Sequence, residues 1–317
     1  MIELLGHQAV EQRFRDAMAR DHMHHAWLLH GVRGIGKFML AEKLAARLLC
    51  ESATACGTCH ACQMFRAGSH PDLFRVKLLE KKRDISIDQV RELLAFLALS
   101  GAEGERRVVI LDQAERLNHQ AANALLKGLE EPATGSLLLM VCADAMKLPA
   151  TVRSRCLIQH CSPLNDGDVR RVLEPKLQPE SLDLAVQLAD GCPGRVSCLE
   201  DAGLAEALAG WQRLVADVSR ADIGKLDTWC RAHVATVPHE LIIQVLLQPL
   251  YPILQRQQAD DFAALEAVHV AAKQCMRWPG EVIRQSLRAA PTLLSNVLAL
   301  RSALRSADQT GIHAQVG

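Results

Sequence analysis

The sequence predicts an α/β domain with a parallel sheet, followed by helical regions. Three observations lead to this prediction. Short apolar runs alternate with helical patterns over the first 160 residues, which is typical of a parallel α/β sheet. A glycine loop, GVRGIGKF at 31–38, stands between an apolar run and a helical pattern. Beyond about residue 161 the sequence has helical patterns but no convincing strands.

The elements of the α/β domain follow from these patterns in chain order. We expect short buried strands at 26–30, 72–76, 106–111, 136–143 and 156–160. We expect helices at 37–49, 86–97 and 119–131. Ser86 and Gln89 have the spacing of a capping box at the start of the second of these helices. Pro132 ends the third.

The remainder of the chain divides into two helical regions. NDGDVRRVLEP and ESLDLAVQLADG have helical spacing, and GCPG at 191–194 is a turn. From about residue 208 the pattern is helical, with expected breaks near Pro238, Pro249, Pro279 and Pro291, and the last eight residues have the composition of a frayed tail. The sequence therefore predicts three domains, at 1–161, 162–207 and 208–317.

Composition excludes several classes of protein. The chain has 317 residues, 49% of them apolar and 23% charged, as in a globular protein with a substantial core. The formal net charge is zero, which argues against coating of DNA by charge alone. No run of eighteen apolar residues is present, and MIELLGHQAVEQRF at the N-terminus carries charges where a signal peptide is apolar. We therefore expect a cytoplasmic protein without a membrane span.

The glycine loop has the pattern of a phosphate-binding loop with one departure. Gly31, Gly34, Gly36 and Lys37 stand between a strand and a helix, where backbone N–H groups favour an anion. The next residue should be Ser or Thr, whose hydroxyl binds magnesium, but it is Phe38. Lys37 is either a phosphate ligand or a solvated lysine at a helix start.

A second departure follows the strand at 106–111. An apolar strand that ends in Asp112 has the Walker B pattern, in which the carboxylate lies beside magnesium. ATPases of this kind usually place Glu next, as the base that activates water, but this chain has Gln113, and an amide cannot accept that proton. Glu115 points elsewhere if the segment leaves the strand as a helical turn. The alternative is that Asp112 caps a helix. Loss of both catalytic parts predicts negligible hydrolysis of ATP.

Cysteines gather in one short segment. CESATACGTCHAC places Cys50, Cys56, Cys59 and Cys62 with spacing typical of a structural zinc site, and four thiolates leave no open position for catalysis. His60 is a less favoured substitute ligand, and a redox C-x-x-C pair is a weaker alternative. The three histidines of HMHH, at 22–25, are better explained as a loop than as a metal site.

The sequence Ser154-Arg155-Cys156 is a further candidate. We expect Arg155 at the end of a strand and near a domain edge, where its guanidinium could reach a phosphate bound by a neighbouring subunit. A lone arginine is weak evidence, a surface ion pair is the usual explanation, and Arg153 makes the choice of residue ambiguous.

Together these segments resemble a known family. HAWLLHGVRGIGK, the four-cysteine insertion, GSHPDLFRV, ISIDQVREL, NALLKGLEEP and KLPATVRSRC are similar to bacterial clamp-loader subunits of the AAA+ superfamily over about the first 200 residues. Among these subunits, the presence of Phe38 and Gln113 makes the chain resemble the delta-prime class of the DNA polymerase III clamp loader. The gamma and tau ATPases are expected to have Ser or Thr at the first position and Glu at the second.

The resemblance implies a function. It implies a RecA-like domain with a zinc module, a helical lid and a helical collar, and a stator that loads the sliding (beta) clamp onto primed DNA with gamma or tau and delta. Such a subunit would hydrolyse no ATP itself and would present Arg155 to a neighbour's ATP. It also implies Cys50, Cys56, Cys59 and Cys62 as zinc ligands. Binding of ATP at the altered loop, including Asp112, stays open.

Two departures and two competing interpretations remain. Cys142 and Ala143 stand where AAA+ ATPases usually have a polar sensor residue. Arg195 lies one position after the arginine of the G-x-x-R lid pattern, so we do not assign it the lid sensor role. The first competitor is an active, gamma-like ATPase subunit. The second is a zinc-dependent DNA-binding protein, against which the zero net charge and the absence of a recognition helix after the cysteines count.

Overall fold

The computed structural model describes residues 4–80, 82–99, 106–254 and 262–309, and these fall into two compact units. The first unit combines 1–172 with 189–195, and the second combines 173–188 with 196–317. Each unit is described separately below. The expected three-domain division stays a prediction.

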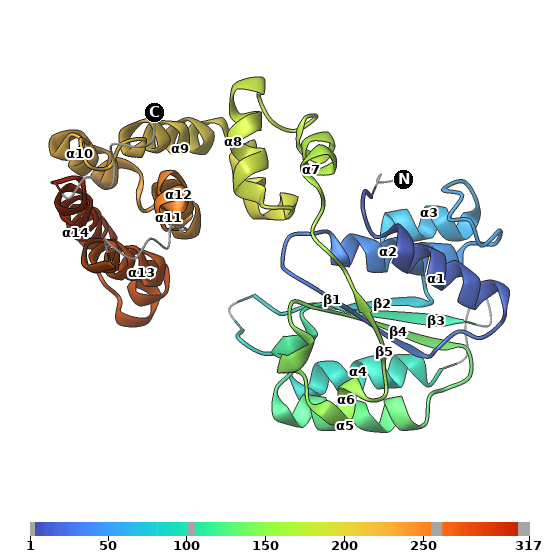
Figure 1. Cartoon of the computed structure of the whole chain (residues 1–317). Helices are drawn as coiled ribbons and strands as arrows, with labels where there is room; N and C mark the ends of the chain where they lie inside the picture. The colour runs from blue at the N-terminus through green and yellow to red at the C-terminus, as the bar shows by residue number, and fades with distance from the viewer. Residues whose placement is uncertain (1–3, 81, 100–105, 255–261, 310–317) are drawn as a thin grey trace. The chain divides into compact units, whose positions relative to one another are not determined.

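A five-stranded parallel sheet forms the centre of the first unit (Figure 1). The strand order is β2-β3-β4-β1-β5, and every neighbouring pair is parallel. The strands are β1 (Ala26–His30), β2 (Leu73–Val76), β3 (Arg107–Leu111), β4 (Ser136–Cys142) and β5 (Leu157–His160). All five predicted strands are therefore confirmed, each within a residue or so of its expected ends.

Helices cover both faces of this sheet (Figure 1). One face packs against α1 (Gln8–Ala19) and α2 (Lys37–Leu49), with α3 (His60–Ala67) beside α2. The other face packs against α4 (Ile87–Leu97), α5 (His119–Glu130) and α6 (Ala150–Arg153). Alternate residues of a strand bury on opposite faces, as the strand period requires. Val108 and Ile110 belong to the first core, and Val109 and Leu111 to the second.

Local signals in the sequence fix the helix ends. Ser86 Oγ accepts a hydrogen bond from the Gln89 backbone N–H, and the Gln89 side chain accepts one from the Ser86 N–H, so the predicted capping box is confirmed. Asn118 caps α5 in the same way through the N–H of Ala121. Two 3-10 turns, η1 (Ala114–Arg116) and η2 (Ala145–Lys147), follow β3 and β4.

The rest of the described chain is helical, as predicted. It contains α7 (Asp166–Leu173), α8 (Pro179–Ala189), η3 (Pro193–Glu200), α9 (Ala202–Val215), α10 (Ile223–His233), α11 (His239–Leu247), η4 (Gln248–Leu250), α12 (Tyr251–Leu254), α13 (Phe262–Gln285) and α14 (Ala289–Gln309). The predicted GCPG turn at 191–194 overlaps the start of η3, which begins at Pro193. The expected frayed tail falls at 310–317, outside the described residues.

Buried tryptophans hold the second unit together. Trp211 donates to the carbonyl of Ile242 and Trp229 to that of Ala207, both at 2.9 Å. Trp278 is 1% exposed and donates to Thr292 across the α13–α14 pair. Each indole N–H is thus satisfied where burial would otherwise be costly.

One expected break is wrong. Pro279 lies inside α13, which continues to Gln285. A proline in a helix interior removes one backbone hydrogen bond. Cys275 and Trp278, on the same helix, are buried against α14, so packing of the apolar face supports the helix through this position. No helix in the described ranges is long and apolar enough to cross a membrane.

Candidate functional site

The glycine loop lies where the sequence places it, between β1 and α2. Gly34 and Gly36 have φ angles of 86° and 91°, which L side chains rarely adopt. A Cβ on Gly31 would collide with the carbonyl oxygen of Cys161, so this position needs glycine because the backbones are close. The loop therefore keeps the backbone shape of a phosphate cradle.

The lysine of the glycine loop forms hydrogen bonds within the loop. Lys37 Nζ donates to the carbonyl oxygens of Gly31 and Val32, at 2.6 and 2.7 Å. The residue is only 6% exposed. Burial lowers the pKa of Lys37, and the nearby carboxylates of Glu115 and Asp112 oppose this change. Of the two sequence interpretations, a solvated lysine is wrong, since the ammonium is buried.

An aromatic ring and a second lysine stand beside the loop. Phe38 packs against the core formed with α1 and α2. The ammonium of Lys77, which follows β2, lies 4.7 Å from the centre of the Phe38 ring, a cation–π contact. Lys77 also helps to hold down the pKa of Asp112. A fixed cation is thus present near the Walker B carboxylate, a feature that the sequence patterns did not identify.

The Walker B segment ends in a tight turn. Asp112 accepts a hydrogen bond from the N–H of Gln113 at 2.9 Å. Gln113 has a φ angle of 52° and precedes η1, so Asp112 is not the helix cap that the alternative interpretation proposed. Burial raises the pKa of Asp112, while the Gln113 N–H, Lys77 and Lys37 lower it.

The expectation for Glu115 is wrong. The segment does leave β3 as a helical turn, η1, yet the Glu115 side chain faces the loop and is 4% exposed. One carboxylate oxygen pairs with Arg33 at 3.1 Å, and the other accepts from the N–H of Ala143 at 3.3 Å. Both partners are distant in sequence, which is why local helix geometry did not predict this direction. Both carboxylate oxygens of Glu115 thus already bind groups of the chain itself.

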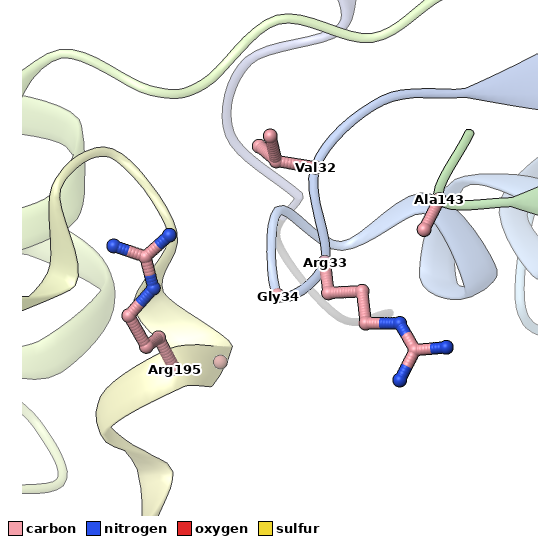
Figure 2. Close-up of a pocket in the computed structure, with 6 residues that line it drawn as sticks. Val32, Arg33, Gly34, Ala143 and Arg195 are labelled. Carbon is pink, nitrogen blue, oxygen red and sulfur yellow. The ribbon is translucent and has the colours of Figure 1, made fainter. Parts of the chain in front are cut away.

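A pocket lies between the glycine loop and the turn at 191–194. It is lined by Val32, Arg33, Gly34, Ala143, Gly194 and Arg195. In Figure 2 the guanidinium groups of Arg33 and Arg195 point away from each other. The N–H of Gly194 donates to the Gly34 carbonyl at 2.8 Å, so the turn is bonded to the loop. Arg195 therefore reaches this site although its sequence position is shifted, and only the fold reveals it.

The four cysteines form one cluster, as the spacing predicted. Cys50 ends α2, Cys56 lies in the following loop, and Cys59 and Cys62 stand at the start of α3. All four sulfur atoms lie within 4.8 Å of one another; Cys50 lies 3.7 Å from Cys56 and 3.9 Å from Cys59, and Cys56 lies 4.0 Å from Cys62. A tetrahedron with metal–sulfur bonds of about 2.3 Å has edges of about 3.8 Å. The cluster could therefore hold a metal ion.

The surroundings of the cluster favour a thiolate at Cys50, whereas burial and the neighbouring Cys59 and Cys50 raise the pKa of Cys62 to about 12. The N–H groups of Cys56, Cys59 and Cys62 each donate to a cluster sulfur at 3.4 Å. Burial raises the pKa of Cys50, but hydrogen bonds from Ser52 and backbone N–H groups outweigh it and bring the value to about 5. His60 is exposed and outside the cluster.

One argument against the DNA-binding alternative is wrong. A helix, α3, does begin directly after Cys59. It is eight residues long, and the guanidinium of its one arginine, Arg66, donates to the Gly57 carbonyl at 3.2 Å. Its arginine is thus engaged with the cysteine loop itself.

The Ser-Arg-Cys segment lies between α6 and β5. Arg155 precedes the strand and does not end one, so that expectation is corrected. Arg153 Nη1 donates to the carbonyl of Leu148 at 2.6 Å and ties down its own loop. Arg155 pairs with Glu130 at 2.6 Å and keeps 35% of its side chain exposed. The structure thus separates the two arginines that the sequence left ambiguous.

The remaining histidine motif is a loop, as expected. Residues 22–25 precede β1, and the rings of His24 and His25 stack with centroids 4.5 Å apart. His24 bonds to the backbone of Ala26. Among the described residues, the four cysteines form the one group with metal-ligand geometry.

Comparison with known proteins agrees with these features. A family model described as "DNA polymerase III, delta subunit" matches residues 6–165. The chain is 42% identical over 193 residues to DNA polymerase III subunit delta' of Pseudomonas aeruginosa, covering 58% of each chain. It is 33% identical over 181 residues to subunit delta' of Escherichia coli, covering 56% of this chain and 54% of that one.

Other matches are to related subunits. The chain is 31% identical over 235 residues to subunit tau of Escherichia coli, covering 71% of this chain and 36% of tau. A solved gamma subunit-related protein from Thermotoga maritima has a TM-score of 0.52 at 17% identity and covers 93% of this chain and 99% of that one, which shows the shared fold. The matches span little more than half the length of the delta' relatives.

Proposed function

The chain belongs to the family of DNA polymerase III delta-prime subunits, and from this premise we propose that it is the non-hydrolysing stator of a clamp loader. In this role it would assemble with gamma or tau and delta subunits, and the assembly would place the beta sliding clamp on primed DNA. Residues 208–317 would form the collar through which the subunits associate, and 162–207 the lid.

The state of the nucleotide site supports the absence of hydrolysis by this chain. A base is missing at Gln113, and the nearest substitute, Glu115, already binds Arg33 and the Ala143 N–H through both oxygens. Phe38 offers no magnesium ligand, and Lys37 is engaged by two loop carbonyls. A nucleotide at Gly31, Gly34, Gly36, Lys37 and Asp112 would have to displace these internal bonds.

The exposure and the contacts of Arg155 are the observation on which the proposal depends. Arg155 stands in a short turn and is partly exposed. The Glu130 carboxylate and the Thr151 carbonyl oxygen hold its guanidinium, which retains further N–H donors. An arginine supplied in trans stabilises the charge that develops on a transferred phosphoryl group. We propose that Arg155 acts in this way on ATP bound by an adjacent gamma or tau subunit.

The cysteine cluster would hold structural zinc. The sulfur separations fit a tetrahedron, and four thiolates would leave zinc no open position for a substrate. The ion would fix the loop between α2 and α3. None of the eleven cysteines forms a disulfide, which suits the reducing cytoplasm, where replication proteins act.

The test is ATP turnover by the assembled loader with clamp and primed DNA. We expect Arg155→Ala to reduce turnover by about 10³-fold or more, once normal assembly of the variant has been shown. Arg153→Ala is the matched control, because Arg153 bonds only to its own loop carbonyls among the contacts described. Turnover unaffected by Arg155→Ala, or reduced equally by Arg153→Ala, would refute action in trans.

A second candidate is a gamma-like ATPase, which the match to tau over 71% of this chain favours. The two candidate functions predict different ATP turnover by the isolated chain. The stator predicts no ATP turnover by the isolated chain, whereas an ATPase subunit would show turnover that depends on Lys37 and Asp112.

A further inference from the structure

We propose that Glu130 is a positioning residue that holds the Arg155 guanidinium ready for a neighbour's phosphate. This inference rests on the proposed function of Arg155 and adds the residue through which the chain prepares it. Glu130 is the last residue of α5, and Arg155 lies in the turn that follows α6. Both helices cover the same face of the sheet (Figure 1), so the pair links the end of α5 to this turn.

The guanidinium is held from two directions. Arg155 Nη2 lies 2.6 Å from Glu130 Oε1, a short charge-assisted contact. Arg155 Nη1 donates to the Thr151 carbonyl at 2.9 Å. An arginine has five N–H donors in a fixed plane. Nη1 also donates to Ser154 Oγ at 3.4 Å. These three contacts fix that plane and leave other N–H groups for a ligand.

Both ends of the pair stand on rigid supports. Leu129 precedes Glu130 and is 3% exposed, and Val152, in α6, is fully buried in the same core. The carboxylate also lies at the C-terminal end of α5, whose helix dipole adds to its attraction for a cation. The buried neighbours therefore hold both ends of the pair in place.

The pair does not remove Arg155 from use. The side chains of Arg155 and Glu130 are 35% and 50% exposed, so water screens the pair and the arginine keeps access to a partner. A guanidinium that is already oriented loses less freedom when it binds a phosphate. Loss of Glu130 should therefore reduce the rate of the chemical step and leave ATP binding by the neighbour unchanged.

The experiment measures steady-state ATP turnover by the assembled loader with clamp and primed DNA. We expect Glu130→Ala to reduce kcat by about tenfold with the KM for ATP unchanged. Glu130→Gln keeps the acceptor oxygen but loses the charge, and we expect a smaller, measurable reduction. Glu131→Ala removes the adjacent exposed carboxylate, which makes no ion pair with Arg155, and should match the parent.

The Arg155→Ala background distinguishes failure of the inference from failure of the proposed function. In that background Glu130→Ala should have no further effect on kcat. Unchanged turnover in Arg155→Ala alone would overturn the proposed function. A normal reduction in Arg155→Ala with parental or faster turnover in Glu130→Ala would overturn only the inference. Additive effects in the double variant, or an equal loss in Glu131→Ala, would also overturn it. If Glu130→Ala fails to assemble, parental turnover in Glu130→Gln overturns it.

Discussion

Gly194→Ala should loosen the contact between the 191–194 turn and the glycine loop. A Cβ at this position would lie 2.9 Å from Gly34 Cα and 3.0 Å from its carbonyl oxygen, where ordinary contacts begin at 3.4 Å. The turn must therefore move by about 0.5 Å, which lengthens the 2.8 Å hydrogen bond from Gly194 to Gly34 to about 3.3 Å, beyond the favourable range.

The cost follows from these two effects. Overpacking costs about 1–3 kcal/mol, and loss of a hydrogen bond costs about 0.5–1.5 kcal/mol. The contact should therefore weaken by about 2–4 kcal/mol. Each 1.4 kcal/mol is a factor of ten in an equilibrium, so local opening should increase roughly 30-fold or more.

Amide hydrogen exchange of peptides covering 31–38 and 189–196 measures this opening. Gly210→Ala, in α9, is the control, because a Cβ there would make contacts of 3.8 Å or longer. It should leave exchange in both peptides unchanged. Parental exchange rates in Gly194→Ala would show that the close backbone approach does not hold the loop, and would refute this reasoning.

Two further predictions concern the metal and pH. The protein purified without a chelator should contain one metal ion. Either Cys56→Ser or chelation should remove the ion and lower the thermal midpoint of unfolding, because the binding energy of a structural ion is folding energy. Elemental analysis combined with thermal unfolding tests this, and an equal midpoint without the metal would contradict it. Burial lowers the pKa values of both His25 and His30 below 6.5. The neighbouring His24 adds to this effect at His25, and His160 adds to it at His30. Both histidines prefer to be neutral when folded, so stability should be full above about pH 7 and fall as the pH drops through 6.5. Urea midpoints between pH 7.5 and 5.5 test the sign, and a midpoint that rises on acidification would contradict it.

Features set by near neighbours could be predicted from the sequence. The capping box depends on Ser86 and Gln89, three residues apart, and the structure contains it. The thiol cluster depends on spacings within 50–62, and its four sulfur atoms do meet. The strands follow from short apolar runs, and the alternation with helices indicated their parallel arrangement. The capping box and the thiol cluster each join groups that are close in sequence, and each strand follows from its own short apolar run, so local spacing and periodicity predict them.

Features set by distant partners needed the tertiary structure. Glu115 turns toward Arg33 and Ala143, which are 82 and 28 residues away, although the local helical turn indicated otherwise. Pro279 leaves α13 unbroken, and Cys275 on that helix is buried against α14.

The ion pair between Arg155 and Glu130 shows the same difference between what the sequence and the tertiary structure reveal. The sequence by itself showed two candidate arginines, Arg153 and Arg155, in one short segment, and Gln113 where a base is usual. Only the tertiary structure decided that Arg155 forms an ion pair while Arg153 bonds to backbone carbonyls, because Glu130 reaches Arg155 from the end of α5. Side-chain direction depends on which charges and buried faces meet when helices pack on the sheet, and no local spacing encodes that meeting.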